Sequence, residues 1–86
     1  MEKLHTDLEV IVYSNPDCFF CHQLTGWLNA RGIPFTEKDI NEEEARNEFK
    51  QTGAWGTPLT IIKKGLSADE VVGFNQFKLA RLLNIK

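Results

Sequence analysis

The chain of 86 residues has no long hydrophobic run. No stretch approaches the roughly 18 apolar residues that suggest a membrane-spanning helix, and the polar beginning, MEKLHTDLEV, lacks the apolar core of a secretory signal. A strong charge bias is also missing, since the net charge is −2 and the basic residues are scattered. A nucleic-acid or anionic-membrane partner would favour a basic face. We therefore expect a cytoplasmic protein that binds neither nucleic acid nor membrane.

Cysteine is scarce as well, because Cys18 and Cys21 in the stretch CFFCH are the only two. Cytoplasmic proteins rarely keep a permanent structural disulfide, and a two-residue spacing closes too small a loop to stabilise the fold much. Cys-x-x-Cys occurs instead as a redox dithiol, as half of a zinc site or, when His follows, as a haem attachment signal. The rest of the sequence has to distinguish these three uses.

The first half of the chain predicts a strand followed by a helix. With 42% hydrophobic and 26% charged residues, the composition is that of one small globular domain. EVIVY (9–13) predicts a buried strand, and a loop follows at 14–18. A helix is expected from near Cys18 to Arg31-Gly32. Its apolar face is expected at positions i, i+4, i+7 and i+8, namely Phe20, Leu24, Trp27 and Leu28.

Residues 33–40 predict a second strand, and Asn41 is expected to cap the helix that follows it. That helix ends at Gly53. Glutamates 42–44 suggest a metal site at first, but consecutive residues point around a helix. We interpret them as a solvated helix start that matches the helix dipole.

Two more strands are predicted at 58–62 and 70–74, joined through a turn near Gly65, and a last helix at about 75–84. The apolar residues of this helix are Phe77, Leu79, Ala80, Leu82 and Leu83. The order is β-α-β-α-β-β-α. It predicts an α/β fold with a four-stranded mixed sheet, helices on its faces and a right-handed first crossover.

Placed on this fold, Cys18 begins a helix at the carboxyl end of the first strand. Free N–H groups and the helix dipole stabilise a thiolate there, and lower a thiol pKa from about 8.5 to about 7 or below. The thiolate is the attacking species in disulfide exchange. Cys21 lies one turn later on the side of Leu24, so it is expected to be buried and to act second. Asp17 opposes this effect by raising the pKa of Cys18, whereas a protonated His22 would assist it.

The two other uses of the motif are poorly supported. A haem protein normally needs export and a distal ligand, and the chain offers only Met1 and His5 for that role. A zinc site needs four ligands. The only histidine and cysteine candidates are Cys18, Cys21, His22 and His5, and the first three cannot easily converge on a regular helix.

The stretches VIVYSNPDCFFCHQL, GTP (56–58) and VVGF (71–74) together make the chain resemble the glutaredoxin family over nearly all of residues 9–85. The resemblance implies one thioredoxin-like domain spanning 1–86. It also implies a cis Thr57–Pro58 bond facing the cysteines and a Thr57 backbone that pairs with a substrate strand. The residues expected to bind substrate are Phe19, Phe20, Trp55, Thr57, Pro58, Gly73 and Phe74. Trp55 could equally belong to the core, and Phe19 could be a tolerated surface residue.

The chain departs from the family at positions that would hold glutathione. The usual Lys before the first Cys is Asn15, and the usual Gly-Gly followed by Asp is reduced to Gly73 with no Asp. Both losses remove groups that would pair with the charges of glutathione. The single Gly-Phe is more similar to NrdH redoxins, which thioredoxin reductase reduces. PDC and IPFTEKDI also resemble the longer Spx-type regulators.

We therefore expect a dithiol–disulfide oxidoreductase with Cys18 as nucleophile and Cys21 as resolving thiol. It needs no bound cofactor or metal. Glutathione and thioredoxin reductase, which draws on NADPH, both stay open as electron donors. A disulfide-containing protein is the expected substrate, and a monomer the expected state. The alternative is a non-catalytic redox sensor or metal-binding module that uses the same two cysteines.

Overall fold

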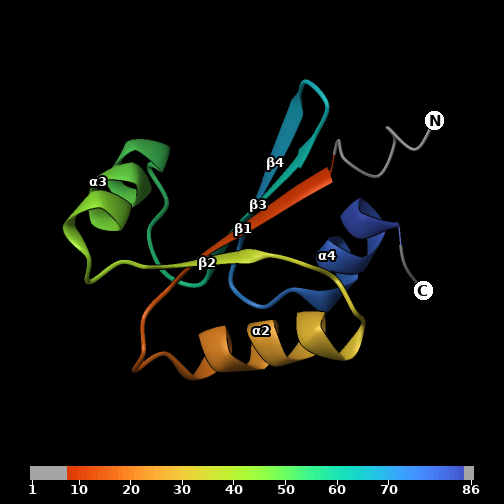
Figure 1. Ribbon diagram of the computed structural model, residues 1–86, viewed down its shortest axis with the longest axis horizontal. Helices are drawn as coiled ribbons and strands as arrows, with labels where there is room; N and C mark the ends of the chain where they lie inside the picture. The colour runs from red at the N-terminus through yellow and green to blue at the C-terminus, as the bar shows by residue number, and fades with distance from the viewer. Residues whose placement is uncertain (1–7, 85–86) are drawn as a thin grey trace.

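Four strands form one mixed sheet in the order β2-β1-β3-β4 (Figure 1). The computed structural model describes residues 8–84. Within that range β1 is parallel to β2 and antiparallel to β3, and β3 is antiparallel to β4. The predicted four-stranded mixed sheet is thereby confirmed. The strands are β1 (Leu8–Ser14), β2 (Thr36–Asp39), β3 (Leu59–Lys64) and β4 (Ser67–Val72).

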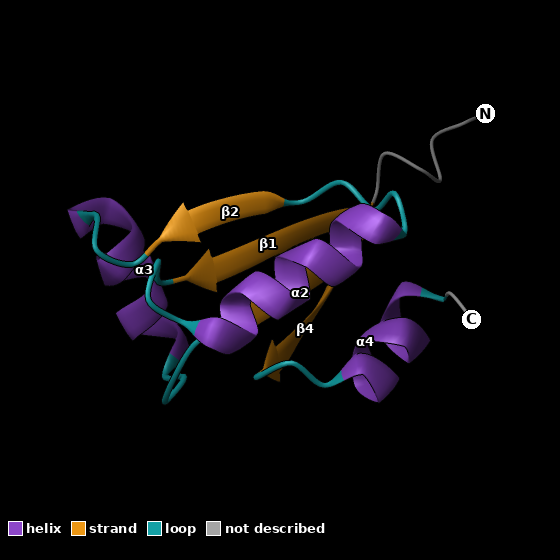
Figure 2. Cartoon of the chain, turned by 90° about the horizontal axis from the view of Figure 1, so that it is seen from below, coloured by secondary structure: helices purple, strands orange, loops and turns teal. Residues whose placement is uncertain are grey.

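Three helices cover the two faces of this sheet (Figure 2). They are α2 (Phe19–Ala30), α3 (Glu43–Thr52) and α4 (Gln76–Leu83). Helices α2 and α4 pack on one face, and α3 packs on the other. The order of elements is the predicted β-α-β-α-β-β-α. None of the helices described between residues 8 and 84 is long and apolar enough to cross a membrane.

Each face of the sheet has its own apolar cluster, because side chains alternate between the two faces of a strand. Under α2 and α4 the cluster consists of Val10, Val12, Leu24, Leu28, Ile62, Val71, Leu79 and Leu83. Under α3 it consists of Ile11, Tyr13 and Leu59, with Phe49 packed against them. β1 therefore contributes to both clusters and is buried from Val10 to Ser14, as its unbroken apolar sequence predicts.

The apolar faces of two helices differ from the prediction at one residue each. Phe20 was expected in the core but is 57% exposed. The buried residues of α2 are Cys21, Leu24 and Leu28, and Phe20 lies about 100° around the helix axis from Cys21. Phe77 of α4 is likewise 89% exposed, because Leu79 and Leu83 face the sheet.

The boundaries of β2 and α3 also differ from the prediction. β2 is shorter than residues 33–40, since the backbone N–H of Ile33 donates to the C=O of Leu28 and so belongs to the end of α2. Asn41 does not cap α3. Its N–H donates to the Asp39 carboxylate, so it lies in a turn, and Glu42 is the N-cap instead. The predicted glutamates do occupy the first turn of α3.

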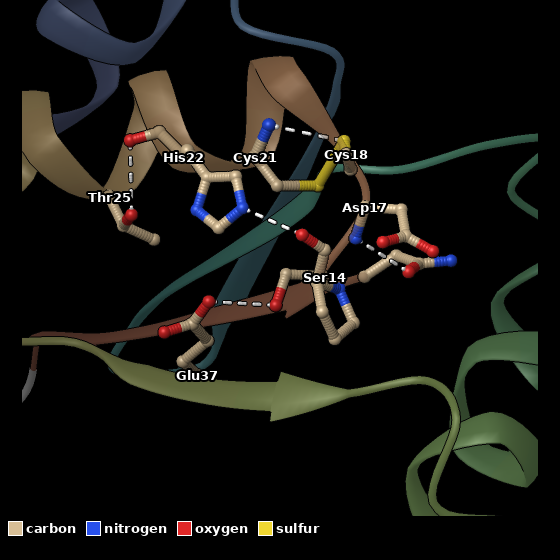
Figure 3. Close-up of a disulfide and its surroundings, with 9 residues drawn as sticks. Ser14, Asp17, Cys18, Cys21, His22, Thr25 and Glu37 are labelled. Atoms are coloured by element: carbon tan, nitrogen blue, oxygen red, sulfur yellow. Dashed lines mark hydrogen bonds between the residues drawn. A yellow bond between two sulfur atoms is a disulfide. The ribbon is translucent and has the colours of Figure 1, made fainter.

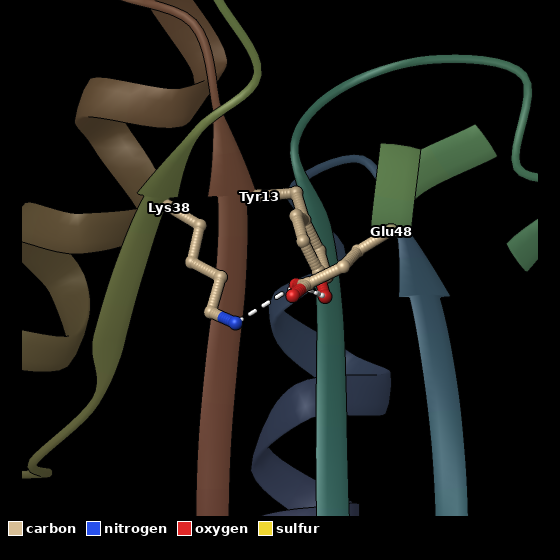
Figure 4. A network of polar contacts seen from close by, with 3 residues as sticks. All are labelled: Tyr13, Lys38 and Glu48. Carbon is tan, nitrogen blue, oxygen red and sulfur yellow. Dashed lines mark hydrogen bonds and ion pairs between the residues drawn. The ribbon is translucent and has the colours of Figure 1, made fainter. Parts of the chain in front are cut away.

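A polar network fastens α3 to the sheet (Figure 4). The Tyr13 hydroxyl donates to the Glu48 carboxylate at 2.9 Å, and the Lys38 ammonium lies 2.8 Å from the same oxygen. Burial, followed by this hydrogen bond, raises the pKa of Tyr13 above its ordinary value. The hydrogen bond from Lys38, followed by that from Tyr13, lowers the pKa of Glu48. The Glu48 carboxylate of α3 thus joins that helix to Tyr13 of β1 and to Lys38 of β2.

The strand register brings three connecting segments to one end of the sheet. Tyr13 of β1 lies opposite Leu59 of β3, which in turn lies opposite Val72 of β4. The loop after β1, the loop before β3 and the loop after β4 therefore lie at the same end. These segments hold Cys18, Pro58 and Gly73, so the topology gathers the predicted site residues.

Candidate active site

Cys18 is the N-cap residue of α2, as the sequence predicts. Its backbone is extended (φ −93°, ψ 113°), and its Sγ atom accepts a hydrogen bond from the N–H of Cys21 at 3.1 Å (Figure 3). The residue is half-buried. A sulfur in this position replaces the hydroxyl or carboxylate that usually caps a helix, and it faces the positive end of the helix dipole. This setting stabilises negative charge on Cys18 whenever the sulfur is a thiolate.

Cys21 is joined to Cys18 by a disulfide, with 5.2 Å between the two Cα atoms. It is 1% exposed and belongs to the buried side of α2. The predicted difference in burial is confirmed, because Cys18 at the helix start is half-buried and Cys21 is buried. Cys18 is therefore the more accessible residue of the pair.

The loop that leads to Cys18 is held by short-range hydrogen bonds. The Asn15 side chain accepts from the N–H of Asp17 at 3.0 Å, and the Asn15 C=O accepts from the N–H of Cys18 at 2.9 Å. The His22 ring places its Nε2 atom 2.8 Å from the Pro16 C=O (Figure 3). His22 thus connects the first turn of α2 to the preceding loop. The sequence did not predict this contact.

A second contact below the loop was also missed in the sequence. The hydroxyl of Ser14, the last residue of β1, donates to the Glu37 carboxylate of β2 at 2.8 Å. Ser14 is 4% exposed, and the bond fixes the point where the chain leaves the sheet towards Cys18. Adjacent parallel strands were predicted, but their register was not, so this pair could not be found.

Three exposed aromatic side chains occur in the predicted site segments. Phe19 is 66% exposed, as expected, and its ring contacts that of Phe20 edge to face, with 5.4 Å between centroids. Trp55 is 86% exposed, so its alternative assignment to the core is wrong. Large apolar surface of this kind beside a reactive group is typical of a site that meets another molecule.

The loops before β3 and after β4 are joined by a backbone hydrogen bond. The N–H of Gly73 donates to the C=O of Pro58 at 2.8 Å. The Thr57–Pro58 bond is cis, as the resemblance implied, and Pro58 is buried. Phe74 is half-buried and packs edge to face against Trp27 of α2, at 6.0 Å between centroids. Its side chain therefore lies on the α2 side rather than among the exposed aromatics.

Positive side chains are absent from the predicted site segments. Residues 14–22, 54–58 and 73–76 contain no Lys or Arg. Among residues 8–84, no three His, Cys, Asp or Glu side chains are placed to hold a metal ion together. His5 and Met1, considered above as zinc or haem ligands, lie outside the described residues.

Comparison with known proteins agrees with this geometry. Residues 10–64 match the glutaredoxin family. A curated relative, the N-acetyl-S-hydroxy-L-cysteine reductase of Bacillus subtilis (strain 168), is 28% identical over 60 residues, which cover 67% of this chain and 64% of that protein. The chain thus spans less than two thirds of the length of that relative.

Two solved structures are similar over most of the chain. A mutant of the thioredoxin-like protein BC3987 is 30% identical, with a TM-score of 0.79, and the match covers 91% of this chain and 97% of that one. The glutaredoxin-like NrdH-redoxin of Escherichia coli is 23% identical, with a TM-score of 0.72 and coverage of 86% and 93%, and it supports the fold. Since the family match covers well over half of the sequence, the chain belongs to the glutaredoxin family.

Proposed function

We propose that the protein is a dithiol–disulfide oxidoreductase. The Cys18 thiolate attacks one sulfur of a substrate disulfide, so that a mixed disulfide forms and the other substrate sulfur leaves as a thiolate, which takes up a proton. The Cys21 thiol loses its proton and attacks the Cys18 sulfur. The second substrate thiolate is released and protonated, and the Cys18–Cys21 disulfide is left. Two electrons pass from the protein to the substrate, and a reductase or thiol must return them.

The observation that carries this proposal is the unequal placement of the two sulfurs. Cys18 caps α2 and is half-buried, whereas Cys21 is 1% exposed and within bonding reach of it. A permanent structural staple would not need one sulfur at a helix N-terminus where a thiolate is favoured. A metal-binding module, one form of the alternative function, would need further ligands beside the two sulfurs, and among residues 8–84 no group of three His, Cys, Asp or Glu side chains could hold an ion. A purely sensing module would use the same two thiols, so turnover of a substrate is what distinguishes it.

The surrounding residues are proposed to bind the substrate. Thr57 and Pro58 would offer backbone groups to an extended substrate segment, and Gly73 would hold that loop through its bond to Pro58. The exposed rings of Phe19, Phe20 and Trp55 would contact apolar side chains that flank the substrate disulfide. Phe74 would contribute through its backbone, since its ring packs on Trp27.

For the electron donor, the charge of the site favours a reductase over glutathione. Glutathione carries two carboxylates, and no Lys or Arg occurs in residues 14–22, 54–58 or 73–76 to pair with them. We therefore propose thioredoxin reductase, supplied by NADPH, as the preferred donor. We propose further that the protein acts as a monomer in the cytoplasm, where reducing systems keep dithiols available.

A second candidate substrate comes from the Bacillus subtilis relative, which is named for reducing N-acetyl-S-hydroxy-L-cysteine. The same pair of sulfurs suits such a compound. Cys18 would attack the sulfur that bears the hydroxyl group. The S–O bond would break, the hydroxyl group would take up a proton and leave as water, and a mixed disulfide would form. Cys21 would then release the N-acetylcysteine thiol. This reaction uses the same two electrons as disulfide reduction.

The test is NADPH oxidation coupled to three acceptors: a small disulfide, a protein disulfide and N-acetyl-S-hydroxy-L-cysteine. Each is supplied either with thioredoxin reductase alone or with glutathione and glutathione reductase. Turnover that needs Cys18 supports the oxidoreductase, and turnover with thioredoxin reductase alone supports the proposed donor. Metal bound to the purified protein together with no turnover of any acceptor would support the sensing or metal-binding alternative.

A further inference from the structure

A groove lies between the second half of α2 and helix α4, with a volume of about 650 Å³. Its walls are Trp27 of α2, Arg31 directly after that helix, Asn75 directly before α4, and Gln76, Phe77, Lys78, Ala80 and Arg81 of α4. Figure 2 shows these two helices on the same face of the sheet. Trp27 follows Cys18 by nine residues, about 13 Å along a helix. Most of this α2–α4 groove is thus separate from the cysteine pair.

The apolar surface of the groove is aromatic and accessible. Phe77 is 89% exposed, so its large apolar ring lies outside the core. Trp27 is half-buried between the ring of Phe74 and the guanidinium of Arg31, which lies 4.5 Å from the centroid of its ring. The indole N–H of Trp27 is buried and has no hydrogen-bond partner among the described residues. The groove therefore offers the ring of Phe77, which the core does not cover, beside the part of Trp27 that stays accessible.

The charge of the groove is opposite to that of the chain. Arg31, Lys78 and Arg81 line it, and no acidic residue does, although the net charge of the chain is −2. Within residues 8–84 the ion pair found is Lys38–Glu48, which belongs to the α3 side of the sheet. None of the three groove cations is paired with a carboxylate of that range. As far as residues 8–84 are concerned, their positive charge is not neutralised by a paired carboxylate and would attract a negative partner.

We propose that the α2–α4 groove is a docking site for an acidic segment of a partner protein that carries a large apolar side chain. Trp, Phe and Arg are all enriched in protein interfaces, and a polar rim around an apolar centre is the usual arrangement. A small anion would instead need buried polar groups that converge on it. The three cations lie on long side chains at the rim. The proposal does not rest on the redox reaction, because neither cysteine lines the groove.

The experiment is an NMR titration of the full chain with a short synthetic peptide of glutamate, leucine and phenylalanine residues. The protein has two tryptophans, Trp27 and Trp55, so two indole N–H signals report on the groove and on the cysteine end separately. Trp55→Phe assigns them. The expected result is a saturable shift of the Trp27 indole and of the α4 amides, with the Trp55 indole unmoved.

Variants then test the charge and the ring. Lys78→Glu together with Arg81→Glu should weaken binding about tenfold, because attraction is replaced by repulsion. Phe77→Ala should weaken it as well. Arg46→Glu with Lys50→Glu makes the same change of charge on exposed residues of α3, and should leave binding unchanged. All these side chains are exposed, so the dispersed spectrum of each variant verifies its fold.

Four outcomes would overturn the proposal. The first is a shift centred on the Trp55 indole. The second is an equal response to a peptide in which lysine replaces glutamate. The third is an equal response to free glutamate or inorganic phosphate, which would indicate an anion site only. The fourth is slower diffusion of the protein alone with rising concentration and loss of that effect in the double variant, which would make a second copy the occupant.

Discussion

The N–H of Cys21 donates to the sulfur of Cys18 at 3.1 Å, and the same two residues share a disulfide. The first turn of α2 therefore holds both proposed reaction partners, together with the N–H group that would stabilise a thiolate on Cys18. The backbone of α2 sets this geometry, so it does not depend on the loops proposed to contact the substrate.

The unequal placement of the two sulfurs predicts unequal results for their substitution. Cys18→Ser should reduce coupled NADPH oxidation to background, because the attacking thiolate is lost. Cys21→Ser should instead accumulate a mixed disulfide with the protein substrate, visible by mass spectrometry as an adduct that a reducing agent removes. If the Cys18→Ser protein formed an adduct on Cys21 as fast as the Cys21→Ser protein forms its adduct, the assigned roles would be reversed.

The exposed ring pair at the start of α2 predicts a defect that depends on the size of the substrate. Phe19→Ala with Phe20→Ala should raise KM for a protein disulfide about tenfold, as loss of an aromatic contact at an interface does, and should barely change reduction of a small disulfide. Steady-state kinetics with both substrates measure the difference. Leu66→Ala, which alters a fully exposed residue of the β3–β4 turn, is the matched control. An equal loss for both substrates would place the rings in the chemistry rather than in docking.

The carboxylate shared by Tyr13 and Lys38 predicts that the free energy of unfolding falls in acid. The hydrogen bonds from Lys38 and Tyr13 lower the pKa of Glu48 below its ordinary value of 4.5. The stabilisation is thus present at neutral pH and is lost as the pH falls through the region below that value. Urea unfolding across this range should show a shallower decline for Glu48→Gln than for the wild type. Glu70→Gln, an exposed change on β4, should decline like the wild type.

Two glycines predict changes of stability of opposite sign. Gly73 has φ +86°, where a side chain is strained even with open space around it, so Gly73→Ala should destabilise the fold by about 1–2 kcal/mol. Gly26 lies within α2, and nothing would meet an added methyl group, so Gly26→Ala should stabilise by about 0.5–1 kcal/mol. Urea unfolding of the oxidised protein measures both. Destabilisation by Gly26→Ala would show that α2 does not accept a side chain at this position, although Gly26 is exposed.

The elements could be predicted from the sequence where local rules decide the outcome. Cys18 begins α2 and Gly53 ends α3 because cap chemistry is read from a few residues. The burial of Cys21 follows from its helical spacing to Leu24. Phe20 shows the limit of this reasoning. Helical spacing alone allowed either it or Cys21 to lead the apolar face, and packing against the sheet selected Cys21.

Contacts between distant segments could not be predicted in the same way. The bond between Gly73 and Pro58 spans loops whose relative position depends on the register of β3 and β4. The groove beside Trp27 depends on how α4 lies against α2. Phe77 was expected among the apolar residues of α4, and it faces solvent because α4 presents Leu79 and Leu83 to the sheet.

The direction of β1 and α4 has a practical consequence. β1 starts at the end of the sheet remote from Cys18, and α4 leaves the cysteine end and runs back towards the start of β1 (Figure 1). A linker joined before β1 or after α4 would therefore point away from the reactive sulfur. Fusion to a reporter, or attachment to an electrode or bead, before β1 or after α4 should leave Cys18 facing open solution.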